Sequence, residues 1–289
     1  VVRTTGDRIL DVPLAKIGDK GLFTREMDEA LLAGRADLAV HSLKDVPTRI
    51  PEGLEIAAIS RREDPRDVLI LPPGRAGALR SLPAGARVGT GSLRRGALLR
   101  ALRPDLEAVD LRGNLNTRLA KLDRGDYDAI VLAAAGVLRL GWADRIAEYL
   151  DPDEWLPAVG QGALAVVARS GDEPIGRLLA GFHDPETAAC TAAERAFLAA
   201  LEGGCQVPIG ALARFGAHGL VLDGLVAAVD GGTVLRAAEA IPGGVGEISR
   251  DSAVELGRRL AARLLELGAG EVLARIRSSD TLVPEPAAP

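Results

Sequence analysis

The sequence contains few cysteines, histidines and aromatic residues, and each scarcity argues against a class of protein. Two cysteines cannot form a disulfide framework, which favours a reducing, cytoplasmic compartment. Three scattered histidines and no paired cysteines argue against a zinc site. No apolar run reaches the roughly 18 residues that span a membrane, and no signal peptide opens the chain. We therefore expect a cytoplasmic protein without a metal or a membrane contact.

Lysine is also scarce, and positive charge is concentrated in one stretch of an acidic chain. The net charge of −5 argues against a general nucleic-acid surface. Residues 86–118, however, carry seven arginines against three acidic residues, which suits a small polyanion better than a long polymer. Only four lysines stand beside 31 arginines, and three of them are Lys16, Lys20 and Lys44. This placement favours point-charge contacts, with a solvated basic face as the alternative for any one of them.

Helical and extended patterns alternate through the first half of the chain. Such alternation is typical of parallel or mixed sheets with helices on both faces. Residues 31–42 and 122–133 also resemble each other, each running from a helix through Gly-x-x-Asp into a strand. Two similar α/β domains would explain this echo, and so would two ordinary helix-to-strand turns. The predicted helices are 26–32, 93–102 and 115–123, and the predicted strands are 37–42, 54–60, 68–71, 87–89, 106–111 and 128–133.

A chain of 289 residues is longer than one hydrophobic core ordinarily accommodates. The positions of its proline- and glycine-rich stretches predict three domains. Proline and glycine near 64–67 and 157–162 predict a two-segment hinge, with a strand at 163–169 returning to the first domain. After residue 184 a long helix (185–201), a hairpin (220–229 and 233–241) and a last helix (252–267) predict an α+β domain. The expected division is 1–62 with 163–181, then 66–158, then 184–277, followed by a flexible tail at 278–289.

Two stretches place cations and a carboxylate where ligands bind in open α/β sheets. "PLAKIGDKGLF" (13–23) carries two lysines in a glycine-broken loop before a helix. "HSLKDVP" (41–47) ends a buried strand with Lys44 and Asp45, and ligand sites lie at the carboxyl ends of such strands. Taken alone, Asp45 could equally be a turn or capping aspartate.

Two further stretches open helices with arginine. "GTGSLRR" (89–95) follows a strand and begins a helix capped by Ser92, and "LRGNLNTR" (111–118) repeats this arrangement with an asparagine cap. Arginine in the first turn opposes the helix dipole, so stability alone does not favour Arg94 and Arg95. Backbone N–H groups and two guanidiniums would together form a cradle for an anion.

The stretch "LEGGCQVPIG" (201–210) places Cys205 on a constrained turn. Its glycines and Pro208 argue against a regular helix or a central strand. A cysteine that serves only packing more often lies in a periodic apolar element, as Cys190 does in the preceding predicted helix.

Six stretches together resemble the porphobilinogen deaminase, or hydroxymethylbilane synthase, family, over a match running from about residue 4 to the last predicted helix. They are "HSLKDVP", "RREDPRD", "GTGSLRR", "LRGNLNTR", "PAVGQGAL" and "LEGGCQVPIG". The resemblance implies two α/β domains like type II periplasmic binding proteins, joined by a hinge, and a third, small α+β domain. It implies a transferase of heme biosynthesis that condenses four porphobilinogen molecules, with loss of ammonia, into the linear tetrapyrrole hydroxymethylbilane.

The same resemblance assigns roles to individual residues. Cys205 matches the cysteine that holds a dipyrromethane cofactor through a thioether, and Asp45 matches the catalytic aspartate. The implied enzyme is a monomer that takes porphobilinogen and uses no metal. Positions matching those that hold cofactor or substrate carboxylates are Lys16, Lys20, Ser42, Lys44, Ser92, Arg94, Arg95, Arg112, Arg118, Arg139 and, in the hinge, Gln161.

The chain departs from the family at its start. The family begins with a strand and helix carrying Arg-x-Ser-x-Leu-Ala, and nothing matching precedes "VVRTTGD", so we expect the first sheet to lack a member. Two rival functions remain open. A hinged solute-binding protein would explain the echo and the arginines but not Cys205, and a turnover nucleophile at Cys205 lacks a recognisable histidine partner.

Overall fold

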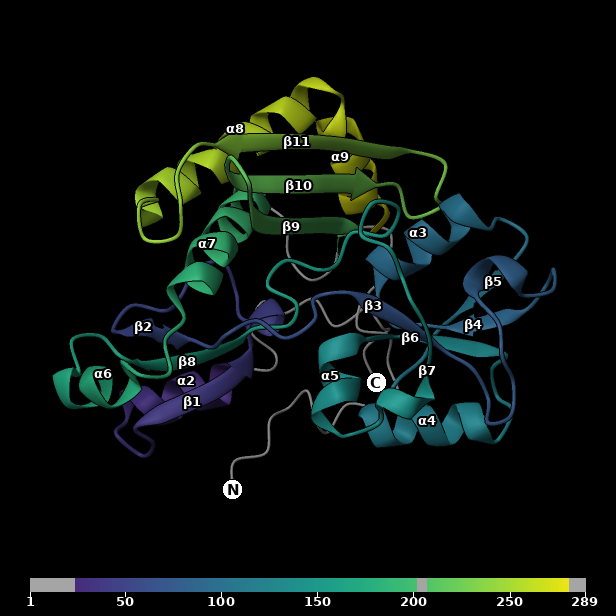
Figure 1. Ribbon diagram of the computed structural model, residues 1–289, viewed down its shortest axis with the longest axis horizontal. Coiled ribbons are helices and arrows are strands. Elements are labelled where there is room, and N and C mark those ends of the chain that lie inside the picture. Colours follow the sequence, from purple (N-terminus) through teal and green to yellow (C-terminus); the bar gives the residue numbers. More distant parts are fainter. Residues whose placement is uncertain (1–23, 202–206, 281–289) are drawn as a thin grey trace, which may run out of the picture.

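A computed structural model describes residues 24–201 and 207–280, which form three parts with one sheet each (Figure 1). Two α/β parts lie side by side, and the third part lies across both of them. Lys16, Lys20 and Cys205 fall outside the described residues. Among the described helices, none combines the length and apolar character needed to cross a membrane.

The first part contains a three-stranded sheet in the order β1-β8-β2, with β8 antiparallel to both neighbours. The predicted return of a strand after the second crossing is thereby confirmed. Val166 of β8 packs toward Leu179 of α6, and Val167 packs toward Leu31 of α2, so helices cover both faces. The elements are α2 (Arg25–Leu32), β1 (Leu38–Ser42), β2 (Leu54–Ile59), β8 (Leu164–Arg169) and α6 (Glu173–Leu179).

The second part contains a five-stranded mixed sheet in the order β5-β4-β6-β3-β7. β4 is parallel to β5 and β6, whereas β3, which enters from the hinge, is antiparallel to β6 and β7. The predicted caps are confirmed, because Ser92 accepts from Arg95 N–H and Asn114 accepts from Thr117 N–H. The elements are β3 (Asp67–Ile70), β4 (Arg87–Gly89), α3 (Leu93–Leu102), β5 (Glu107–Val109), α4 (Leu115–Asp123), β6 (Ala129–Ala133), α5 (Ala134–Arg139) and β7 (Ile146–Tyr149).

The sequence echo corresponds to one connection that occurs in both α/β parts. Gly34 follows α2 and Gly125 follows α4, with φ of 66° and 85°. Each donates its N–H to a carbonyl of the helix it ends, and each leads into a strand, β1 or β6. Glycine fits these left-handed positions, where a Cβ atom would cause strain. The observed sheets confirm the predicted fold class, and the division at particular residues stays a prediction.

The third part is an antiparallel meander, β11-β10-β9, with helices on one face. Alternate residues of β10 separate its two faces, because Leu220 and Leu222 join the core beneath α7 and α8, while Leu225 joins the cluster that contains α3 of the second part. The third sheet is therefore packed on both sides. The elements are α7 (Pro185–Ala200), β9 (Ile209–Gly216), β10 (Gly219–Ala227), β11 (Val234–Ile241), α8 (Arg250–Glu266) and α9 (Ala269–Asp280).

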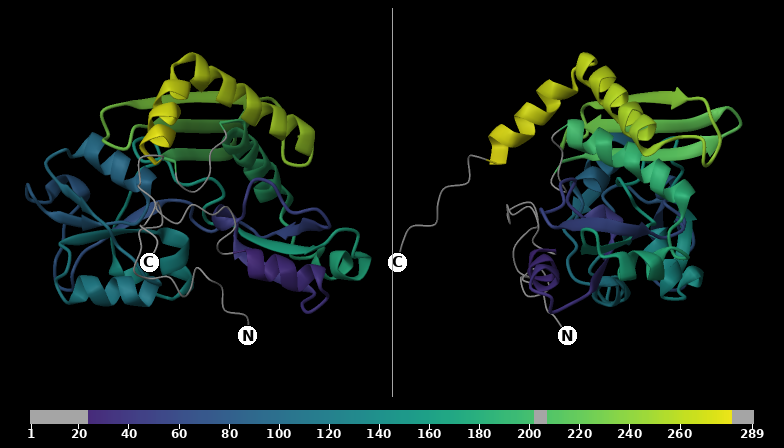
Figure 2. Two further views of the ribbon diagram at one scale, coloured as in Figure 1. Left: turned by 180° about the vertical axis from the view of Figure 1, so that it is seen from behind. Right: turned by 90° about the vertical axis from the view of Figure 1, so that its left-hand side faces the viewer.

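Two elements of the third part were not predicted. Helix α9 follows α8 at an angle and reaches Asp280, beyond the residue at which the sequence suggested a tail (Figure 2). Strand β9 includes Gly210 and lies at the sheet edge. Glycine within a strand often marks a site where another backbone approaches closely. A Cβ atom on Gly210 would lie 3.0 Å from the carbonyl oxygens of Leu156 and Pro157, so this glycine lets β9 approach the second crossing closely.

Candidate functional site

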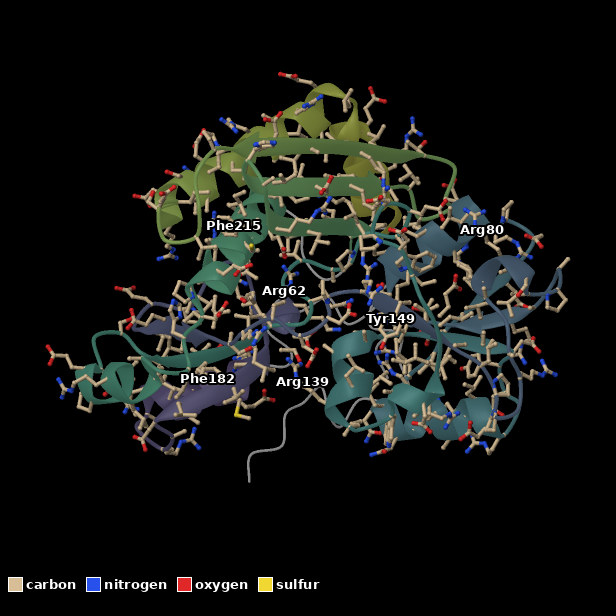
Figure 3. The ribbon with its side chains drawn as sticks, viewed as in Figure 1. Arg62, Arg80, Arg139, Tyr149, Phe182 and Phe215 are labelled. Carbon is tan, nitrogen blue, oxygen red and sulfur yellow. The ribbon has the colours of Figure 1, made fainter. Side chains whose placement is uncertain are left out.

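The predicted site residues gather around the two crossings that connect the α/β parts. Figure 3 shows Arg62, on the first crossing, and Arg139, on α5, in the region between these parts. Arg62 Nε donates to the carbonyl of Gln161 over 2.9 Å, which holds the two crossings together. The site is therefore assembled from chain segments about 100 residues apart in sequence.

Asp45 follows β1 in a short 3-10 turn, Leu43–Asp45. Leu43 is buried and donates its N–H to the carbonyl of Ala163, and Val46, also buried, donates to the carbonyl of Leu43. Asp45 itself is exposed between these two buried neighbours. The turn thus presents the carboxylate outward at the carboxyl end of β1, as the sequence predicted.

Lys44 connects the first α/β part to the second crossing. Its Nζ lies 3.4 Å from Oε1 of Gln161. Burial lowers the pKa of the Lys44 ammonium; Arg95 and Arg94 lower it further, whereas Asp45 and Asp67 raise it. Lys44 therefore lies within the electrostatic range of the second part's arginine pair.

Asp67 is the centre of a buried polar cluster that comprises Asp67, Arg94, Arg95, Trp155 and Gln161. Its Oδ1 accepts from Arg95 at 2.7 Å and from Gln161 Nε2 at 2.7 Å. Its Oδ2 accepts from Trp155 Nε1 and pairs with Arg94, both at 2.8 Å. Burial alone would raise the pKa of the Asp67 carboxyl, but Arg94 and Arg95 hold it well below its usual range. Asp67 is thus a charged, fully bonded carboxylate.

This cluster corrects the interpretation of Arg94 and Arg95. Stability alone was not expected to favour arginine in the first turn of α3, but both guanidiniums are buried and pair with Asp67, which stabilises them there. Arg94 also donates to the carbonyl of Leu156, and Arg95 to that of Val131. Asp67 was missed because its 28-residue separation from Arg95 gives no local signal. In the described part of the chain, the buried Nε groups of Arg94 and Arg95 have no hydrogen-bond partner.

We expect Asp67→Asn to lower the free energy of unfolding by about 3–5 kcal/mol, because two buried guanidiniums would lose their counter-charge. Since folding lowers the pKa of Asp67, its contribution is present above about pH 4 and is lost as the pH falls toward the folded-state value. The difference between wild type and variant should therefore shrink on acidification.

Urea unfolding at pH 7 and below pH 4 measures this effect. Glu173→Gln, which removes an exposed pair with Arg177, is the matched control, and we expect it to change the free energy by under about 1 kcal/mol. Equal losses for the two variants would contradict the assignment of Asp67 as the cluster's essential charge.

Arg118 adds positive charge to the same region. Its Nε donates to the carbonyl of Gly113 at 2.7 Å. Burial and then the nearby Arg95 and Arg112 lower the pKa of Arg118 to about 10, although Asp110 and Asp45 act in the opposite direction. The cations of this region are Lys44, Arg94, Arg95, Arg112 and Arg118, against the carboxylates of Asp45, Asp67 and Asp110. The excess of positive charge suits an anionic ligand.

The other predicted residues have varied positions. Gln161 is buried and joins the Asp67 cluster, and Arg139 donates to the carbonyl of Gly162 at 2.7 Å, so it also contacts the second crossing. Ser92 uses its oxygen as the cap of α3. Ser42 ends β1 opposite Leu164. The structure thus brings most of the predicted residues to one region, and their binding roles stay predictions.

Glu194 and Arg195 of α7 were missed by the sequence analysis. Glu194 is fully buried and accepts hydrogen bonds from Arg62 and from the N–H groups of Gly160 and Ala213. Arg195 donates to carbonyls of the loop that follows Asp45. Their partners on the first crossing and on that loop lie more than 130 residues away in sequence, so no local pattern marks these two residues.

Two family models match this chain. Residues 1–177 match "Porphobilinogen deaminase, dipyromethane cofactor binding domain", and residues 188–266 match "Porphobilinogen deaminase, C-terminal domain". Porphobilinogen deaminase of Syntrophobacter fumaroxidans is 54% identical over 267 residues, covering 92% of this chain and 86% of that protein. The enzyme of the same name from Desulforudis audaxviator is 53% identical over 277 residues, covering 96% and 87%.

Among solved structures, the periplasmic VFT2 domain of BvgS from Bordetella pertussis aligns with 54% of this chain and 64% of that domain. The two are 19% identical and the TM-score is 0.33. The fold assignment therefore rests on the sheet topologies described above.

Proposed function

The chain belongs to the porphobilinogen deaminase family, and we propose that Asp45, Cys205 and the cations around Gln161 carry its activity. It is a transferase that condenses four porphobilinogen molecules head to tail, with loss of ammonia, into hydroxymethylbilane, a step of tetrapyrrole and heme biosynthesis. The single observation that supports the residue assignment most is the convergence of cations from both α/β parts beside an exposed Asp45.

The residues present fit a dipyrromethane cofactor. Each pyrrole of such a cofactor carries two carboxylates, and the site offers more cations than carboxylates together with two buried, unpartnered Nε groups among the described residues. Arg94 and Arg95 would hold carboxylates through these groups, and Lys44, Arg112 and Arg118 would contact those further out. When bound, the cofactor supplies the primer on which the product is assembled.

Asp45 is suited to act on the substrate's charge and protons. Loss of ammonia from porphobilinogen leaves a cationic azafulvene, and a carboxylate near its pyrrole nitrogen stabilises that charge. The same oxygen atoms can accept the nitrogen's proton and return it. Because Asp45 is exposed beside two buried residues, its carboxylate can meet a substrate without unfolding the turn.

The two cysteines differ in ways that favour Cys205 as the attachment point. Cys190 lies buried in α7, where burial first, and then Glu194, raises the pKa of its thiol to about 12. A thiol held protonated at neutral pH is a poor nucleophile. Cys205 follows α7 in the sequence, within a stretch whose glycines and proline predict a turn, and it matches the family's cofactor cysteine. This assignment also argues against a solute-binding protein, which needs no thiol.

We further propose that the protein acts as a monomer in the cytoplasm. The second and third parts share a core cluster within one chain, and each of the first two parts also has its own core. Size-exclusion chromatography with light scattering on the purified enzyme should give a mass near 30.1 kDa. A stable dimer would overturn the monomer assignment.

We expect Arg118→Leu to carry the covalent primer yet stall with partly elongated chains. Loss of one desolvated charge-assisted contact costs about 1.5–3 kcal/mol, roughly ten- to a hundredfold in an equilibrium. Arg94→Leu or Arg95→Leu should instead prevent assembly of the primer, because these residues lie deeper and also hold Asp67.

Intact-mass spectra before and after addition of porphobilinogen give the ladder of covalent species for each variant. Arg124→Leu is the control, since Arg124 is exposed and lies at the C-terminal end of α4, the helix that contains Arg118. Identical ladders for Arg94→Leu, Arg95→Leu and Arg118→Leu would contradict separate roles in primer assembly and elongation. They would indicate that the arginines act only through their combined positive charge.

A further inference from the structure

We propose that Arg195 is a positioning residue for Asp45, an assignment that rests on the catalytic role proposed for Asp45 above. Arg195 lies on α7 in the third part, and its guanidinium bonds the loop that immediately follows Asp45 in the first part. Nη1 donates to the carbonyl of Val46 at 3.0 Å, and Nη2 donates to those of Pro47 and Thr48 at 2.6 and 3.3 Å. Three consecutive carbonyls are thus fixed by one side chain.

These hydrogen bonds are the interactions that the structure shows for the guanidinium of Arg195. Burial first, and then the nearby Arg250, lowers the pKa of Arg195 to about 10, because both disfavour the charged form of the guanidinium. Among residues 24–201 and 207–280, no carboxylate forms a salt bridge with it. A partly buried guanidinium without a counter-charge is retained here by its carbonyl acceptors, and these acceptors all belong to the Asp45 loop.

Glu194, the residue before Arg195 on α7, holds the two crossings of the hinge in a similar way. Glu194 binds Arg62 on the first crossing and the N–H of Gly160 on the second. Two consecutive residues of one helix therefore hold the hinge and the Asp45 loop. Helix α7 ends at Ala200, five residues before Cys205 in the sequence. One helix thus contacts the loop that follows Asp45 and also precedes, in sequence, the segment proposed to hold the primer.

Arg195 acts on one side of Asp45 only. On the other side the turn is fixed independently, because Leu43 is buried and bonds the carbonyl of Ala163. Removing the guanidinium should therefore leave the fold and the primer in place while widening the range of positions open to the Asp45 carboxylate. Misplacement by about 1 Å can reduce a rate about a hundredfold. We expect the loss in kcat, with little change in KM.

The test compares Arg195→Met with Arg169→Met in the full-length enzyme. Arg169 is the control because it also donates to backbone carbonyls, those of Leu31 and Ala36, but within the first part and away from Asp45. Unlike Arg195, it also pairs with carboxylates, those of Asp37 and Asp172. Intact mass counts the enzyme molecules that carry the primer, and urea unfolding measures stability. Arg195→Met should lower kcat per loaded enzyme about 10- to 100-fold with KM within about twofold, and Arg195→Lys should recover part of this loss. Arg169→Met should keep kcat near the wild-type value.

A double-mutant comparison shows whether Arg195 acts through Asp45. In an Asp45→Glu background the carboxylate is already displaced, so the further loss caused by Arg195→Met should be smaller than in wild type. Losses that multiply independently would overturn the proposal, as would a normal kcat for Arg195→Met. If Arg195→Met does not fold, Arg195→Gln, which keeps an amide donor, replaces it in each comparison.

Asp45→Asn, measured alongside, separates this proposal from the proposed function. Near-normal turnover of Asp45→Asn would remove Asp45 from the mechanism and overturn both. An inactive Asp45→Asn together with a fully active Arg195→Met would overturn the positioning role alone.

Discussion

Asp45→Asn should lose most turnover, with kcat reduced about 10²- to 10⁴-fold, while KM for porphobilinogen changes little. The amide has nearly the shape of the carboxylate but can neither offset a developing positive charge nor accept a pyrrole proton. Substrate carboxylates would still bind the cations around Gln161, because the substitution of Asp45 removes none of these cations. Steady-state kinetics of the purified, primer-loaded enzyme give both constants.

Two further variants sharpen this result. Asp45→Glu keeps the charge but shifts its position, so it should retain a small part of the activity. Glu52→Gln removes an exposed carboxylate a few residues after the loop that follows Asp45, and this variant should behave like wild type. Near-normal kcat for Asp45→Asn would exclude Asp45 from the chemistry.

Cys205→Ser should give a folded protein that carries no covalent pyrrole and has no measurable turnover. The glycine-flanked turn has no sequence feature that needs sulfur for folding, whereas a thioether needs it by definition. Intact mass, urea unfolding and product formation together separate loss of the anchor from loss of the fold.

Cys190→Ala is the matched control, because it removes the other thiol from the helix that precedes the anchor. Burial keeps that thiol protonated, so modification and activity should persist, with a stability loss from the small cavity. Turnover by Cys205→Ser, or loss of modification in Cys190→Ala, would contradict the assignment of the two cysteines.

Much of the fold followed from local signals in the sequence. Ser92, Asn114 and Asp184 each accept from a backbone N–H of the helix they precede, and the starts of those helices were predicted within a residue. The Asp-Gly-Gly stretch at 230–232 likewise marked the hairpin of β10 and β11. Strand β9 was missed because Gly210 and Pro208 resemble turn residues, yet the glycine there serves a close approach to the second crossing.

The site was predictable as a set of residues but not as a set of contacts. Lys44, Arg94, Arg95 and Gln161 do lie together, but Asp67, which binds three of the site's side chains, was predicted only as the last residue of the hinge stretch 64–67. Arg195 was not singled out from the sequence for the same reason. In each case the partner is fixed by tertiary packing over a long sequence separation, which periodicity and capping rules do not address.

Cys205 is proposed to hold the growing pyrrole chain, and peptide mass mapping of the active, full-length enzyme tests this most directly. Before substrate is added, the peptide containing Cys205 should be heavier by two linked pyrrole units, and the peptide containing Cys190 should be unmodified. After addition of limited porphobilinogen, the Cys205 peptide should show a ladder that rises by one pyrrole unit per step. An active enzyme whose Cys205 peptide has its unmodified mass throughout would contradict the account.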